Sequence, residues 1–104
     1  MDIHNCRCIC IVKNSDIGGF ILFSTHTDHI FIQRCYTCPK LRGQGVFKCM
    51  FNHLTTSYPT IRFKLEVYED NIHAINVYRH LGFCKDQLFI DPYNSRPYIT
   101  MIYN

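Results

Sequence analysis

The sequence has no apolar run of the roughly 18 residues that a membrane-spanning helix needs. Its start, MDIHNCRC, lacks the basic residues and apolar core of a signal peptide. No internal repeat, linker or low-complexity segment is present. The net charge of +3 is too small to indicate a nucleic-acid partner. These absences predict a cytoplasmic protein without a membrane or nucleic-acid partner.

Alanine is almost missing, because Ala74 is the only one, while isoleucine greatly outnumbers valine. Asparagine and tyrosine are also common, which is typical of translation from an AT-rich genome, and one interpretation is a viral protein in the host cytoplasm. Apolar residues make up 47% of the 104 residues. That fraction predicts a folded chain with one modest core.

Seven cysteines are many for this length, and their number is odd. Without a signal peptide we do not expect a disulfide framework. Cys6, Cys8 and Cys10 alternate and so share one strand face, where we expect them to be buried small hydrophobes. Cys35 and Cys38 form a CxxC that could be half of a redox or zinc site. No second pair has the matching spacing, so we predict no metal.

The first third of the chain has the pattern of an antiparallel meander. Residues 6–13, 20–26 and 30–36 are apolar and β-prone, and the turn-forming residues NSDIGG (14–19) separate the first two segments. A helical pattern follows from Val46 to Leu54, with apolar residues on one face, and Pro59 closes it.

The rest of the chain alternates again between strand and helix patterns. Residues 61–67 alternate apolar and charged side chains, and residues 72–81 place apolar residues every third position before Gly82. Residues 86–91 and 98–103 are predicted as two last strands. The order β-β-β-α-β-α-β-β predicts the α/β class, an α+β fold with a mixed sheet and a right-handed crossover between the third and fourth strands.

A glycine loop, KLRGQGVFK, lies between a predicted strand and a predicted helix. Gly43 and Gly45 permit unusual backbone angles, and N–H groups at a helix N-terminus attract anions. Lys40, Arg42 and Lys48 could add positive charge. A plain turn is the alternative, and the spacing is neither that of a P-loop nor that of a dinucleotide fingerprint.

Two motifs together resemble the GNAT superfamily of N-acetyltransferases. In the family's loop, Arg/Gln-x-x-Gly-x-Gly/Ala, the three marked positions correspond to Arg42, Gly45 and Phe47. The family's downstream set of Asn, Ala, Tyr and Gly-Phe corresponds to Asn71, Ala74, Tyr78, Gly82 and Phe83. The resemblance covers residues 18–104.

This resemblance implies a sheet splayed between the third and fourth strands, with acetyl-CoA as cosubstrate. The pantetheine arm would bond to the backbone near Cys35 and Thr37. Tyr78 would protonate the CoA thiolate, or serve only in the core. Asn71 would contact the cofactor arm, or serve only as a helix N-cap. The pyrophosphate would lie on the N–H groups of Arg42, Gly43, Gln44, Gly45, Val46, Phe47 and Lys48.

Two departures from the family pattern bear on function. Phe47 stands where the family has a small residue, so its ring would crowd the pyrophosphate or turn into the core with Phe51. Only five residues precede the first strand, so we expect a single domain, 1–104, lacking the usual N-terminal strand and two helices. We also expect residues 6–13 to be a sheet edge that invites a homodimer.

The function predicted is acetyl transfer from acetyl-CoA to an amine of a protein or small molecule. His29 and Glu66 are candidates for the base that relays the amine proton. The alternative is a non-catalytic protein of the same fold that acts by binding CoA or another protein. The acceptor amine is left open, because the part of the family that reads acceptors is missing.

Overall fold

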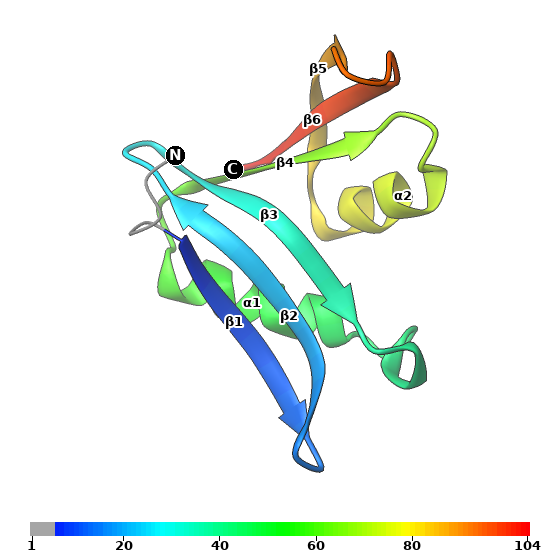
Figure 1. Cartoon of the computed structure of the whole chain (residues 1–104). Helices are drawn as coiled ribbons and strands as arrows, with labels where there is room; N and C mark the ends of the chain where they lie inside the picture. Colours follow the sequence, from blue (N-terminus) through cyan, green and yellow to red (C-terminus); the bar gives the residue numbers. More distant parts are fainter. Residues whose placement is uncertain (1–5) are drawn as a thin grey trace. The chain divides into compact units, whose positions relative to one another are not determined.

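The computed structural model describes residues 6–104, and these form six strands and two helices in the order β-β-β-α-β-α-β-β (Figure 1). This order confirms the predicted α+β class. Residues 1–5, where the sequence showed no signal-peptide pattern, lie outside the described residues. Neither helix in residues 6–104 has the length and apolar character that a membrane crossing requires.

The chain divides into two compact units, a first ending at Ile61 and a second from Arg62 to Asn104. Each unit is described by itself below. The assignment of residues 1–104 to a single domain stays a prediction.

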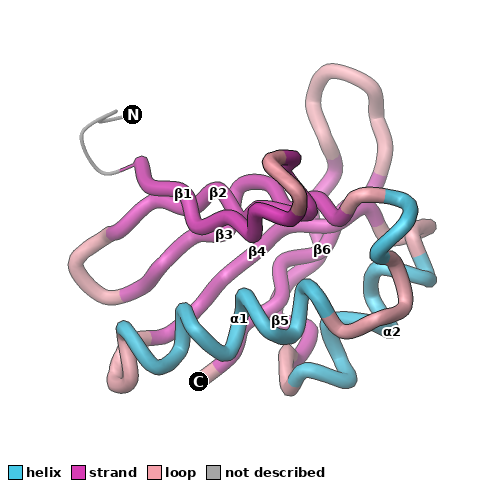
Figure 2. Tube along the Cα trace, turned by 90° about the horizontal axis from the view of Figure 1, so that it is seen from below, coloured by secondary structure: helices cyan, strands magenta, loops and turns pink. Residues whose placement is uncertain are grey.

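The first unit is an antiparallel meander covered by one helix. Strand β1 (Cys6–Lys13) pairs with β2 (Asp16–Thr25), which pairs with β3 (His29–Thr37), as the sequence predicted. Helix α1 (Val46–Ser57) lies along one face of the three strands (Figure 2). The buried side chains of this unit include Ile21, Phe23, Ile30, Ile32, Met50, Phe51 and Leu54.

The turn between β1 and β2 is shorter than predicted. Residues 14–19 were expected to form it, but only Asn14 and Ser15 do, with φ of 53° and 66°, and β2 already begins at Asp16. The two glycines of the segment serve packing instead. A Cβ on Gly18 would lie 2.7 Å from Leu41 Cδ1, and one on Gly19 would lie 2.8 Å from the Tyr36 carbonyl oxygen. Close approach, not turn geometry, therefore requires glycine here.

The cysteines of β1 are not buried as predicted. Cys8 and Cys10 are exposed and Cys6 is half-buried, whereas Ile9 and Ile11, on the opposite strand face, are both half-buried. The alternation was correct, but α1 covers only the isoleucine face of the strand. Strand β1 pairs with β2 and with no other strand of residues 6–104. The homodimer through this edge stays a prediction.

The second unit places β6 (Pro97–Tyr103) between β4 (Arg62–Tyr68) and β5 (Cys84–Ile90), with both pairings antiparallel. Helix α2 (Ile72–Leu81) joins β4 to β5. It ends at Gly82, whose φ of 111° is left-handed, as the sequence predicted for a helix C-terminus. The ring of Phe83 contacts Tyr78 and Tyr103, at centroid distances of 5.9 and 5.5 Å. These contacts hold the end of α2 to β6.

Candidate anion-binding loop

The segment after β3 turns sharply before it reaches α1. The N–H of Cys38 donates to the Gly18 oxygen at 2.8 Å, which ties the end of β3 to β2. One 3-10 turn follows over Pro39–Leu41, where proline supplies a helical φ without needing an N–H acceptor. Arg42 is extended again, with φ −65° and ψ 143°. The chain thus enters the glycine loop from a short, hydrogen-bonded turn.

Gly43 and Gly45 both adopt the left-handed conformation, with φ of 78° and 76°. A Cβ added at either position would meet nothing within 4 Å. The backbone angle therefore requires glycine at both positions, while the space beside each stays open. This confirms the unusual backbone angles predicted for the two glycines, while close approach of a ligand stays a prediction.

The N-terminus of α1 is built to attract an anion. The N-cap of the helix is Gly45, which has no side chain that could bond to the helix N–H groups. No acidic residue lies in the first turn. The N–H of Cys49 donates to the Gly45 oxygen at 2.9 Å, so the N–H groups of Val46, Phe47 and Lys48 precede the helical ladder. These N–H groups and the helix dipole concentrate positive potential at one point.

Two side chains of the loop fold back on the backbone. Arg42 Nε donates to the Thr37 oxygen at 3.0 Å, and Gln44 Nε2 donates to the Lys40 oxygen at 3.0 Å. Both bonds hold the loop in its curled form. Lys40 and Lys48 are exposed and add positive charge around it.

Phe47 stacks on Phe51 one turn further along α1, with ring centroids 6.2 Å apart and planes at 5°. Phe51 is only 2% exposed, so it anchors the half-buried ring of Phe47 to the core. Of the two orientations that the sequence left open, the structure has the one in which the ring joins Phe51.

The two predicted pantetheine contacts lie at the end of β3. Cys35 pairs with Ile21 and Thr37 with Gly19, and both side chains are half-buried. The Thr37 oxygen already accepts the bond from Arg42. A carbonyl oxygen has a second lone pair, so the position can still accept from a ligand.

The other predicted site residues belong to the second unit. Asn71 caps α2, since its Oδ1 accepts from the Ala74 N–H at 3.2 Å. The predicted N-cap is thus confirmed, and cofactor contact stays a prediction. Tyr78 lies on α2 and is half-buried, with its ring against Phe83. Both roles considered for Tyr78, acid or core residue, therefore stay predictions.

The remaining candidates are dispersed. His29, the first residue of β3, bonds to Asp28 at 2.7 Å, and Glu66 is exposed on β4. Cys35 and Cys38 carry free thiols. Within residues 6–104, no three His, Cys, Asp or Glu side chains are placed to hold one metal ion.

Sequence reasoning missed the residues at the tip of the β1–β2 hairpin that line a pocket with this loop. Lys13, Asn14 and Asp16 line one pocket together with Lys40 and Gln44 of the loop. The available signal was topological: in an antiparallel meander, the first turn and the end of the third strand lie at the same end of the sheet.

A family model described as acetyltransferase (GNAT) family matches residues 1–83. A curated relative from Bacillus subtilis subsp. natto, assigned as a spermine N(1)-acetyltransferase, is 38% identical over 94 residues. The spermine/spermidine N(1)-acetyltransferase of Bacillus subtilis strain 168 is 23% identical over 94 residues. Each match covers 79% of this chain and 62% of the relative. The chain therefore spans less than two thirds of the length of these curated relatives.

Solved structures match nearly the whole chain. Nourseothricin acetyltransferase has a TM-score of 0.84 at 22% identity, covering 98% of this chain and 66% of its own. A Bacillus anthracis protein assigned as a streptothricin acetyltransferase, solved with acetyl coenzyme A, has a TM-score of 0.82 at 18% identity. That match covers 96% of this chain and 62% of the other. These likenesses confirm the predicted fold.

Proposed function

Because the chain belongs to the GNAT family of acetyltransferases, we propose that it transfers an acetyl group from acetyl-CoA to an amine. Members of this family use acetyl-CoA as their cosubstrate. The observation that carries the proposal is the N-terminus of α1, where no side chain or acid competes with an incoming anion. Two left-handed glycines next to it leave open space.

In this proposal the CoA pyrophosphate lies on the loop N–H groups from Arg42 to Lys48. Charge and backbone geometry support this placement, because an anion there meets helix-terminal N–H groups and exposed lysines. The pantetheine arm bonds to the backbone of β3 near Cys35 and Thr37. The stacking of Phe47 on Phe51 supports this placement of the pyrophosphate, because a ring held against Phe51 does not block the loop.

The chemistry is direct attack by the acceptor amine on the thioester carbonyl carbon. A C–N bond forms, the C–S bond breaks, and the amine proton passes to a base, for which His29 and Glu66 are the candidates. Tyr78 gives its proton to the departing CoA thiolate. The ordinary pKa of a tyrosine is about 10 and that of a thiol about 8.5, so this transfer is feasible.

Titration calorimetry of the full chain with acetyl-CoA tests the first step, and the expected result is saturable binding. The formation of free CoA from acetyl-CoA should then be measured with spermine, spermidine and a lysine peptide as acceptors. Polyamines come first because two curated relatives are named for them. Absence of binding up to millimolar acetyl-CoA would overturn the proposal.

A second candidate is a non-catalytic CoA-binding protein of the same fold. The observation that favours it is Phe47, which stands where the family loop has a small residue. This candidate predicts acetyl-CoA binding without transfer to any amine offered. Turnover with any acceptor would exclude it.

A further inference from the structure

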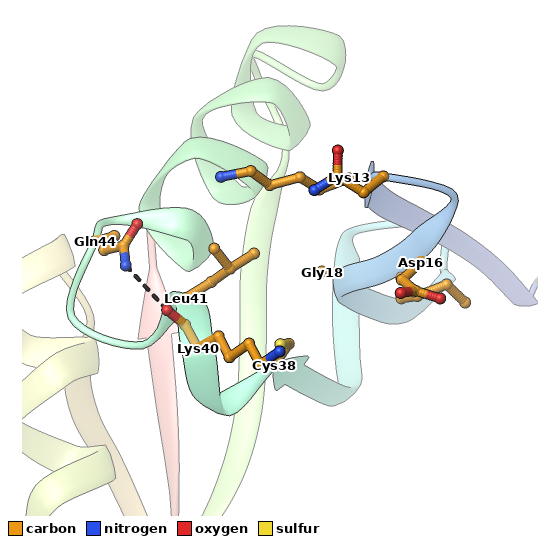
Figure 3. A pocket seen from close by; sticks show the side chains of 9 residues that line it. Lys13, Asp16, Gly18, Cys38, Lys40, Leu41 and Gln44 are labelled. Carbon is orange, nitrogen blue, oxygen red and sulfur yellow. Dashed lines mark hydrogen bonds between the residues drawn. The ribbon is translucent and has the colours of Figure 1, made fainter.

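A pocket of about 380 Å³ lies within the first unit, between the tip of the β1–β2 hairpin and the segment that follows β3 (Figure 3). Its lining residues Lys40 and Gln44 belong to the glycine loop. Its lining residues include Lys13, Asp16 and Gly18 from the hairpin, and Lys40, Leu41 and Gln44 from the loop side.

Backbone contacts hold the two walls of this pocket together. The Cys38 N–H donates to the Gly18 oxygen at 2.8 Å. Gly18 approaches Leu41 so closely that a Cβ would lie 2.7 Å from its Cδ1. On the loop side, Gln44 bonds to the Lys40 oxygen (Figure 3). Backbone contacts as well as side chains therefore shape the pocket.

Two ammonium groups and one carboxylate line the pocket, which gives it a net positive charge. Lys13 lies opposite Asp16 in the strand register, yet the two form no ion pair. Figure 3 shows the Lys13 side chain extending away from Asp16 and toward the loop, with Lys40 on the opposite wall. Within the described part of the chain, neither ammonium group is in an ion pair.

We propose that this pocket binds a phosphate monoester, with Lys13 and Lys40 as its two cations. Lysine binds phosphate as a point charge, and two ammonium groups match the charge of about −1.5 to −2 that a phosphate monoester carries at pH 7. Leu41 and Ile17 offer apolar surface to the organic part of the ligand, and the Asn14 amide offers donors.

Two kinds of ligand can supply the phosphate monoester. One is the 3′-phosphate of CoA itself, and this source rests on the proposed function. Lys40 and Gln44 belong to the loop and also line the pocket, so one ligand with three phosphates could span both places. The other source is a separate phosphorylated small molecule that binds beside the cosubstrate.

Calorimetry of the full chain with CoA and with dephospho-CoA distinguishes these sources, because the two ligands differ only in the 3′-phosphate. If that phosphate occupies the pocket, CoA binds more tightly, and Lys13→Gln lowers its affinity about three- to fivefold, as expected for an exposed ion pair. Lys13→Gln leaves dephospho-CoA affinity unchanged.

Phenyl phosphate serves as the probe for a separate ligand, alone and with saturating dephospho-CoA. Binding should shift the amide NMR signals of Gly18 and Cys38. It should weaken about three- to fivefold in Lys13→Gln and strengthen in Asp16→Asn, which removes the repelling carboxylate. Lys85→Gln is the matched control, because it removes an exposed lysine from β5 in the second unit.

Each outcome decides between the possibilities. A preference for CoA that Lys13→Gln abolishes supports the pocket with the cosubstrate as source. Equal binding of CoA and dephospho-CoA, with Lys13-dependent binding of phenyl phosphate, supports a separate ligand. If CoA and dephospho-CoA bind equally and phenyl phosphate binding does not depend on Lys13, the proposed phosphate site is overturned. If neither CoA form binds, the proposed function fails, and phenyl phosphate alone decides about the pocket.

Discussion

Arg42 Nε donates a hydrogen bond to the backbone oxygen of Thr37 at 3.0 Å. The bond joins the glycine loop to the last residue of the strand that precedes it. A guanidinium has five N–H donors, so Arg42 can fix the loop and still offer donors to an anion. This one contact links the shape of the loop to the proposed binding of an anion.

Arg42→Ala should therefore weaken acetyl-CoA binding about fivefold or more. The substitution removes one hydrogen bond to the backbone, worth about 1 kcal/mol, together with one positive charge. Arg62→Ala is the matched control, since Arg62 Nε also donates one hydrogen bond, to Asn104 Oδ1 at 2.9 Å. Calorimetry should show reduced affinity in the first variant only, and equal loss in both would contradict this role.

Gly45→Ala and Gly82→Ala should both lower stability, by different amounts. Gly45 has open space, so only its left-handed φ of 76° is strained, at a cost of about 1 kcal/mol. A Cβ on Gly82 would also lie 3.0 Å from Tyr103 Cε2, so we expect about 2 kcal/mol. Thermal unfolding should show the larger drop in melting temperature for Gly82→Ala, and the reverse order would disprove this account.

Phe47→Ala should leave acetyl-CoA affinity within about twofold while lowering the free energy of unfolding by about 1 kcal/mol. The ring stacks on Phe51, so its loss removes a half-buried aromatic contact rather than an obstacle. Calorimetry and denaturant unfolding measure the two effects separately. A gain in affinity of tenfold or more would mean that the ring crowds the pyrophosphate after all.

Tyr78→Phe should slow acetyl transfer about a hundredfold, the low end for a general acid, without changing acetyl-CoA affinity. Its ring contact with Phe83 is retained in phenylalanine, so stability should change little. Tyr58→Phe is the matched control, because Tyr58 lies after α1 with its ring against Phe23. An unchanged rate in Tyr78→Phe would remove this residue as the acid.

The sequence predicted the order of the six strands and two α-helices of residues 6–104 and the two left-handed glycines of the loop. Apolar periodicities of two and of about 3.6 residues are local, and so are the backbone preferences of Gly43, Gly45 and Gly82. The strand limits differed most at β2, because Asp16–Gly19 has the composition of a turn. There the need for close packing against Leu41 and Tyr36 put Gly18 and Gly19 inside a strand.

Alternation by itself could not tell which face of a strand is covered. It placed Cys6, Cys8 and Cys10 on one face, but only the position of α1 decided that Cys8 and Cys10 are exposed. The pocket between Lys13 and Lys40 likewise depends on residues that meet only after folding. The sequence by itself determined the elements and the backbone conformation of the glycine loop, because these follow from local backbone chemistry. The tertiary structure alone decided exposure and partners, because these depend on contacts between segments far apart in the chain.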